Sequence, residues 1–393
     1  MRPVYLDHIA ATPPRPEVVD AMLPFLGESY ANPQSLHSGG QESLQAVEES
    51  RARVAGLIGA SAEEVVFTAS GSESNNLALK GMALAGRARG KRIIVSAIEH
   101  LSVLNAAKSL EKLGFETVLV PVDGLGRVDP EDVRKALTKG TVLVSVQTAN
   151  SEVGTLEPVA EIARISRENG VPFHTDAIAA AGNVPFDVRA LGVDALSLAA
   201  DQFYGPKGAA ALYLRKGTRI VPLVDGGVQE GGRRGGTENV PAIVGMGRAA
   251  EIAAAEMTKW IGTETSLRDH LIRGLLEKVD RSVLTGDPSS RLPHHASFCV
   301  EFIEGEAMLL HLDMKGVAAS SGSACTSKSL KVSHVLLAMG VDHALAQGSL
   351  VFSLLETTTA ADIDRVLEVF PPIVDTLRRM SPLFTKFLEE KTS

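Results

Sequence analysis

Short apolar, β-branched runs alternate with amphipathic stretches through the first half of the chain, and this alternation constrains the fold most. Strands separated by helices of about 10–15 residues predict a parallel sheet covered by helices on both faces. We expect strands at 65–68, 92–98, 116–122, 141–149, 171–176, 193–200 and 209–214. We expect the intervening helices at 74–87, 102–113, 130–137 and 159–168. The last two strands flank the tight turn YGPKG, which predicts a hairpin at one edge of the sheet.

The pattern changes after Asn239, where long helical stretches replace the alternation. We expect helices at 241–260 and 263–279, a strand at 296–302 and closing helices over 360–391. A chain of 393 residues exceeds what one hydrophobic core usually organises, so two domains are expected. We assign residues 1–15 to an N-terminal segment, 16–255 to a large α/β domain and 256–393 to a small α+β C-terminal domain.

The charge and the cysteine content argue against several classes of protein. The formal net charge of -8 disfavours nucleic-acid binding, which requires a clustered basic surface. No apolar run approaches the roughly 20 residues that span a bilayer, and the N-terminal MRPVYLDHIAATPPRP lacks the apolar core of a signal peptide. Cys299 and Cys325 form neither a disulfide framework nor a CxxC metal site. We therefore expect a cytoplasmic protein that binds no metal, nucleic acid or membrane.

The segment FTASGSESNNLAL joins the end of an expected strand to the start of a helix. Ligands of open α/β sheets collect at such junctions, where helix N-termini point. Gly71 and Ser72 would offer backbone N–H groups and a hydroxyl to an anion, with the helix dipole adding to the attraction. The alternative is that Ser70 or Ser72 only caps the helix.

At each of two further strand ends, one residue has two possible roles. Asp176 in HTDAIAAAG either caps a helix that begins at Ala177 or keeps a ligand nitrogen protonated. His100, which ends IIVSAIEH, is either structural or catalytic.

The run SSGSACTSKS has the small polar residues of a solvent-facing loop. It contains Cys325, and Lys328 nearby would lower the pKa of that thiol, so Cys325 is the candidate reactive cysteine. Cys299 alternates with apolar residues in ASFCVEF and is expected to be an inert core thiol. His294 and His295 have no acidic or thiol partner at metal-ligand spacing, and we expect them in a loop.

Taken together, several motifs resemble those of the cysteine desulfurases, pyridoxal-phosphate enzymes of the aminotransferase class V group. The motifs occur in the family's order, from Tyr5 to about Pro382, and are YLDHIAATPP, FTASGSESNNLAL, EH, NSEVGTLEPV, HTDA, YGPKG, GGTENVPAIVGMG and SSGSACTS. The resemblance implies the aminotransferase-like fold (pyridoxal-phosphate fold type I), with a mainly parallel seven-stranded sheet in the large domain. It also implies a homodimer that takes sulfur from L-cysteine and passes it to an acceptor such as an iron–sulfur scaffold protein.

The resemblance assigns roles to particular residues of this chain. Gly71 and Ser72 would hold the cofactor phosphate, His100 would stack on the pyridine ring, and Asp176 would pair with the ring nitrogen. The partner subunit's Thr237 would reach the phosphate. On the loop SSGSACTS, the resemblance makes Cys325 the nucleophile that receives sulfur as a persulfide.

The chain departs from the family pattern at several of its site positions. Gln202 stands where the family has the lysine that binds pyridoxal phosphate as a Schiff base. The other departures are Ala199 for a serine, Asp201 for a histidine, Ser151 for an asparagine, Ala179 for a glutamine, and Val351 and Gly231 for arginines. The nearby Lys207 belongs to the family's GPKG turn, for which we expect a structural role. Ordinary catalysis with the cofactor is therefore expected to be impaired.

Three functional hypotheses follow from the resemblance and these departures. The chain is a cysteine desulfurase-like enzyme that uses the cofactor without the lysine, or a non-catalytic homologue that relays sulfur or docks on a scaffold. The third hypothesis is a different ligand in the remodelled pocket, with Asp201 and Gln202 as new contacts.

Overall fold

The expected strands of the large sheet are present in the computed structural model, which describes residues 3–322 and 332–392. Their order is β2-β8-β7-β6-β5-β3-β4. β8 is antiparallel to both neighbours and the other pairs are parallel, so the mainly parallel seven-stranded sheet is confirmed. The strands are β2 (Val65–Thr68), β3 (Arg92–Ser96), β4 (Glu116–Val120), β5 (Thr141–Ser145), β6 (Phe173–Asp176), β7 (Ala195–Ala199) and β8 (Ala210–Leu214).

β7 and β8 form the expected hairpin, but this hairpin does not lie at the edge of the sheet. β2 pairs with β8 from Val65 opposite Tyr213 to Thr68 opposite Ala210, and β2 becomes the edge strand. The backbone groups on the outer side of β8 are thereby paired instead of being left open to solvent. The prediction of an edge hairpin is wrong for this reason.

Apart from the edge strand β4, the strands are buried on both faces, which explains their nearly continuous apolar character. The helices of this part are α1 (Pro16–Gly27), α2 (Ser38–Ile58), α3 (Gly71–Gly86), α4 (Leu101–Glu111), α5 (Pro130–Ala136), α6 (Val159–Glu168) and α7 (Val188–Leu191). In β3, Ile93 and Val95 pack into an apolar cluster with α3 and α4, and Ile94 packs into a second cluster with α2 and α6. Successive side chains of a strand point to opposite faces, so each face of the sheet has its own core.

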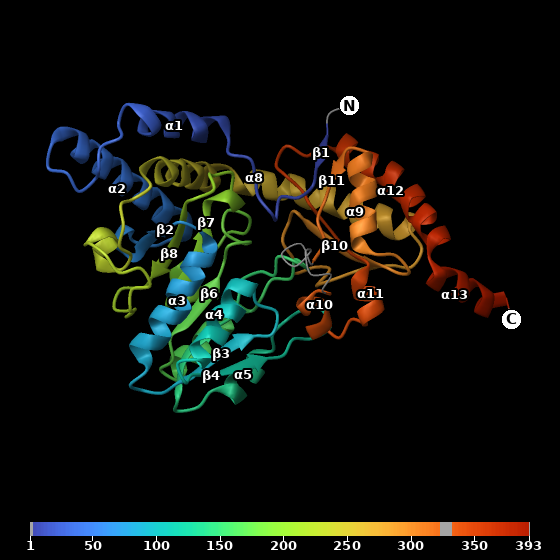
Figure 1. The fold of residues 1–393 in the computed structure, drawn as a ribbon, viewed down its shortest axis with the longest axis horizontal. Helices are drawn as coiled ribbons and strands as arrows, with labels where there is room; N and C mark the ends of the chain where they lie inside the picture. Colours follow the sequence, from blue (N-terminus) through green and yellow to red (C-terminus); the bar gives the residue numbers. More distant parts are fainter. Residues whose placement is uncertain (1–2, 323–331, 393) are drawn as a thin grey trace.

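α8 (Val240–Lys278) is one continuous helix of 39 residues where two helices were expected. The expected break includes Gly262, which has no neighbouring atom where a Cβ would lie and stays helical at a cost of about 1 kcal/mol. Trp260 packs into the cluster beside the large sheet, and Leu271 packs into the core of the C-terminal part. Burial of both halves outweighs one glycine, so the prediction of two helices is wrong. The domain division near residue 255 stays a prediction, and α8 passes through that residue without interruption (Figure 1).

The C-terminal part is built on a three-stranded antiparallel sheet of order β12-β10-β9. Its strands and helices are β9 (Ser282–Leu284), β10 (His295–Val300), α9 (Gly305–Met314), β11 (Val317–Ala318), α10 (His334–Ala338), α11 (His343–Gln347), β12 (Ser349–Ser353), α12 (Ala360–Met380) and α13 (Pro382–Thr392). β1 (Val4–Tyr5) pairs in parallel with β11, so the start of the chain belongs structurally to this part (Figure 1).

Three features expected from composition and patterning can be compared with the described residues. His294 and His295 were expected in a loop, but His295 pairs with Ser353 and is the first residue of β10. His294 directly precedes this strand, and both histidines are buried. Among the described residues, no helix is long and apolar enough to cross a bilayer. The same residues contain no cluster of three or more His, Cys, Asp or Glu side chains that could hold a metal ion.

Candidate functional site

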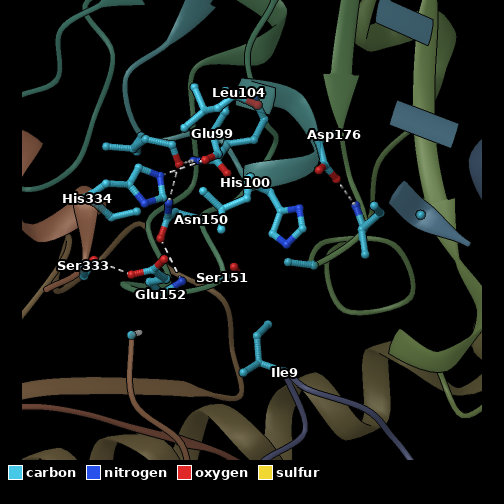
Figure 2. A pocket seen from close by; sticks show the side chains of 18 of the residues that line it. Ile9, Glu99, His100, Leu104, Asn150, Ser151, Glu152, Asp176, Ser333 and His334 are labelled. Carbon is cyan, nitrogen blue, oxygen red and sulfur yellow. Dashed lines mark hydrogen bonds between the residues drawn. The ribbon is translucent and has the colours of Figure 1, made fainter. Parts of the chain in front are cut away.

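A cavity of about 1200 Å³ opens where the strands of the large sheet end and the C-terminal part approaches them (Figure 2). The large sheet supplies residues that directly follow its strands, among them His100 after β3 and Asp176 at the end of β6. The C-terminal part supplies Ser333, His334 and Val351. The cavity thus occupies the position where open α/β sheets bind ligands.

The turn before α3 presents unpaired N–H groups to this cavity. Gly71 and Ser72 are the first two residues of the helix, whose N–H groups have no partner within the helix. Ser70 accepts a hydrogen bond from the Glu73 N–H at 3.2 Å, so the capping alternative is confirmed for Ser70. A Cβ at position 71 would lie 2.3 Å from Cδ1 of Ile178, which leaves room for glycine alone unless Ile178 moves.

Asp176 is a buried carboxylate held in one orientation at the end of β6. Its Oδ2 accepts from the Asn75 amide at 2.6 Å, and its Oδ1 accepts from the Ile178 N–H at 2.9 Å. No helix begins at Ala177 in the described structure, so the capping alternative for Asp176 is wrong. Burial raises the pKa of Asp176, and His100 and the two donors act in the opposite direction. Such a carboxylate stabilises a protonated ring nitrogen.

His100 caps α4 and reaches the cavity between Ser151 and Asp176 (Figure 2). Its Nδ1 accepts from the Ser102 N–H at 3.1 Å and lies 2.8 Å from the Ser102 hydroxyl, so its Nε2 is the nitrogen left for a ligand. The Asn75 amide donates to the Ser102 hydroxyl at 2.9 Å as well as to Asp176. Asn75 and Ser102 therefore couple the two expected site residues, and sequence reasoning missed both.

Gln202 occupies the lysine position directly after β7, in a short 3-10 turn, and only 5% of it is exposed. Its backbone carbonyl lies 3.0 Å from His8 Nε2 and accepts from the Asn183 amide at 3.1 Å. Its own side-chain amide donates weakly to the Ile9 carbonyl at 3.4 Å. Residue 202 is thus fixed by its backbone, and its side chain lines the cavity.

His8 and His294 stack behind Gln202 with their ring centroids 4.2 Å apart. His8 Nδ1 lies 2.8 Å from the Leu354 carbonyl, so both nitrogens of this ring face carbonyl oxygens. Burial lowers the pKa of both imidazoles. The pair connects the N-terminal segment, the lysine position and the C-terminal part, and no local sequence signal indicated it.

Two hydrogen bonds join the walls of the cavity across its opening. The Ser333 hydroxyl donates to the Glu152 carboxylate, and His334 Nε2 lies 3.0 Å from the Glu99 carbonyl (Figure 2). Burial raises the pKa of Glu152 to about 7. Glu99 is fully buried, accepts from Ser96 and from the Gln147 N–H, and has its pKa raised well above the usual range by that burial.

The lining is poor in cations at the positions where the family pattern has arginine or lysine. Val351 lies in β12, is buried and faces the cavity, and Ala179 and Ala199 also line it. The carboxylates among the described lining residues are Glu99, Glu111, Glu152, Asp176 and Asp201. The only lysine or arginine among these lining residues is Lys108, an exposed residue of α4. Gly231 is exposed and lies outside this lining.

Two expected site residues, Cys325 and Thr237, remain outside this constellation. Cys325 and its neighbour Lys328 fall outside the described residues. Thr237 is exposed and does not line the cavity of its own chain, and its role across a dimer stays a prediction. Cys299 is buried in β10, and burial raises the pKa of its thiol to about 12, as expected for an inert core cysteine.

Comparisons with known proteins agree with this geometry. The model of the family "Aminotransferase class-V" matches residues 4–366. Two cysteine desulfurases named IscS are each 50% identical to this chain: that of Dictyoglomus turgidum over 381 residues, 97% of each chain, and that of Methanosarcina thermophila over 383 residues, 98% of this chain and 95% of the relative.

Solved structures give the same result. A NifS-like protein superposes with a TM-score of 0.90 at 37% identity, covering 95% of this chain and all of the other. A NifS-like protein from Rickettsia africae gives 0.86 at 31% identity, covering 95% of this chain and 100% of that one. The chain therefore belongs to the aminotransferase class V family, within its cysteine desulfurase group, whose proteins adopt the pyridoxal-phosphate fold type I.

Proposed function

We propose that this cysteine desulfurase homologue mobilises sulfur through Cys325 as an enzyme whose catalysis with pyridoxal phosphate is strongly impaired. The observation that carries the proposal is the buried Gln202 at the position of the lysine that the family uses to bind pyridoxal phosphate covalently. A carboxamide is not nucleophilic at neutral pH, so it cannot replace a lysine amine.

The residues present fit two parts of pyridoxal phosphate. Asp176 is buried and oriented as the acceptor for a protonated pyridine nitrogen, and His100 extends into the same cavity. The N–H groups of Gly71 and Ser72 suit the phosphate. When bound, this cofactor supplies an electron sink to the carbon that carries the substrate amine. Asp176 would hold the proton on the ring nitrogen, and His100 would pack against the ring.

The residues do not fit the aldehyde of that cofactor or the carboxylate of an amino-acid substrate. Val351 offers no donor in place of an arginine clamp, and each lost charge-assisted hydrogen bond weakens binding by about 1.5–3 kcal/mol. Lys207 is exposed and lies outside the lining, which supports a structural role for it.

The lost clamp favours a second candidate function, sulfur relay without catalysis. The Cys325 thiolate would then take the outer sulfur of a persulfide on another protein, whose own thiol is released, and pass that sulfur by the same exchange to an acceptor such as an iron–sulfur scaffold protein. We propose a homodimer in both cases, with the partner subunit's Thr237 at the phosphate. A cytoplasmic location fits either role, because thiols stay reduced there.

The test is the release of alanine and sulfide from L-cysteine, with added pyridoxal phosphate and a thiol reductant. We expect no sustained release from the wild-type chain, and a measurable gain for Gln202→Lys if the remaining pocket suffices. The matched control is Lys207→Gln, which changes the exposed lysine of the same turn and is expected to behave as wild type. Many turnovers by the wild-type chain would contradict the proposal.

A cellular experiment separates the two candidate functions. Sulfur delivery that is lost in Cys325→Ala but kept in Asp176→Ala supports the relay. Equal loss in both variants supports an enzyme that needs the bound cofactor.

A further inference from the structure

We infer that the cavity takes the amine form of the cofactor, pyridoxamine 5′-phosphate, in preference to the aldehyde form. The inference rests on the proposed function in one respect, because both require a cofactor held without a covalent bond. It goes further in assigning the chemical class of the ligand that the remodelled lysine position recognises.

In a cavity that lacks a nearby amine, the aldehyde form of the cofactor gains no affinity from a covalent bond to the protein. In an ordinary site the covalent bond to lysine favours the aldehyde strongly. Here the only lysine among the described lining residues is Lys108, on the exposed side of α4. Discrimination between the two forms is then left to hydrogen bonds and charge. The aldehyde oxygen only accepts, whereas an ammonium group only donates.

The lysine position presents two acceptors to the cavity, the Gln202 amide oxygen and the Asp201 carboxylate. The Gln202 side chain lines the cavity, and no described residue donates to its Oε1. Its backbone cannot turn away, because its carbonyl is engaged by both His8 and Asn183. The neighbouring Asp201 adds a partly buried carboxylate to the same stretch of lining. An aminomethyl group placed there can donate to the Gln202 amide oxygen and lies beside a carboxylate, whereas an aldehyde oxygen can accept only from the neutral Gln202 amide N–H.

The charge of the lining acts in the same direction. Asp201 lies in the lining beside Gln202, and Val351 stands where the family pattern has the arginine that would attract a substrate carboxylate. An alkylammonium is therefore attracted to the carboxylate side of the cavity. The phosphate of the same ligand would lie at the N–H groups of Gly71 and Ser72, so its negative charge is met separately.

Isothermal titration calorimetry with three ligands isolates the amine. Pyridoxamine 5′-phosphate, pyridoxal 5′-phosphate and 4-deoxypyridoxine 5′-phosphate share the ring and the phosphate and differ at one substituent. We expect the wild-type protein to bind the amine about tenfold or more tightly than the deoxy compound, as a charge-assisted hydrogen bond provides. We expect the aldehyde to bind no more tightly than the deoxy compound.

Four variants test which residues cause the preference for the amine form. Gln202→Leu keeps the volume but removes the acceptor, and the preference for the amine should fall at least threefold. Gln202→Lys should reverse the preference, with pyridoxal phosphate retained on the protein after borohydride reduction. Asp176→Asn should weaken all three ligands by a similar factor, and Lys207→Gln should change none of the ratios. Circular dichroism of each variant verifies its fold.

Three outcomes overturn the inference. They are amine and deoxy affinities within twofold of each other, tighter binding of the aldehyde by the wild-type protein, and no binding of any of the three ligands. The assay contains no cysteine, so sustained desulfuration in the earlier experiment would defeat the proposed function without altering these ratios.

Discussion

Glu157 is a buried acid whose titration should be visible in the stability of the whole protein. It is 8% exposed, and its Oε2 accepts from the Val128 N–H at 2.9 Å. Its Oε1 has no hydrogen-bond partner among the residues that the structure describes, and burial raises the pKa of Glu157 to about 8. Its own N–H donates to the Thr148 carbonyl at 3.0 Å, so it anchors the loop that carries Glu152 into the cavity.

The sign of the effect follows from the direction of this pKa change. The native state holds the Glu157 proton more tightly than the unfolded chain does, whose carboxyl titrates near 4.5. The free energy of unfolding is therefore highest below that value, falls as pH rises, and levels off above about pH 8. Between pH 6 and pH 9 the loss amounts to about 3 kcal/mol, at about 1.4 kcal/mol for each pH unit up to the folded pKa.

Glu157→Gln removes this titration while its amide oxygen can still accept from Val128. Urea unfolding at pH 6 and pH 9, followed by circular dichroism, measures the difference in stability between variant and wild type. We expect that difference to shift by about 3 kcal/mol in favour of the variant at pH 9. Comparison with the wild type cancels the contributions of other buried acids such as Glu99 and Glu264.

The control is Glu161→Gln, an exposed acid of α6, which should follow the wild type at both pH values. A difference for Glu157→Gln that stays constant within about 0.5 kcal/mol between pH 6 and pH 9 would refute the reasoning.

Two more predictions concern the turn at α3 and a buried ion pair. Gly71→Ala should push Ile178 into the cavity, because the new Cβ would lie 2.3 Å from Cδ1, and we expect about tenfold weaker binding of pyridoxamine 5′-phosphate by calorimetry. Gly71→Ala combined with Ile178→Ala should recover most of that loss, and no recovery would contradict the steric explanation. Glu230→Ala should lower the free energy of unfolding by about 3–5 kcal/mol, because Arg51 at 2.7 Å loses its buried partner. Urea unfolding of the variant and the wild type measures this loss. A loss below about 1 kcal/mol would show that the Arg51 guanidinium is solvated in the variant, which would contradict the prediction.

The large sheet was predictable because its signal is local. The inner strands have apolar residues facing two cores, as Ile93 and Ile94 do in β3, so the sequence shows a short continuous apolar run between helices. The edge position of β2 was not predictable, since pairing with β8 joins residues that are far apart in the chain. The continuity of α8 was missed because the packing of Trp260 and Leu271 in two different cores is a property of the folded chain.

The candidate site was likewise predictable only where its residues have a local sequence signal. Gly71, Ser72, His100 and Asp176 follow strands and were identified from that placement, and they line one cavity. Asn75 and Ser102, which join Asp176 to His100, look like ordinary helix residues in the sequence. The stacked His8 and His294 come from segments almost 300 residues apart, and only the fold brings them together behind Gln202.

The pairing of β1 with β11 has a consequence for how the chain folds during translation. Val4 and Tyr5 are translated more than 300 residues before their strand partners, Val317 and Ala318. The first strand therefore waits, unpaired, while the large sheet folds. A tag or fusion placed before Val4 would be carried to the finished C-terminal core, and a deletion of residues 1–6 would damage the last part of the molecule to fold.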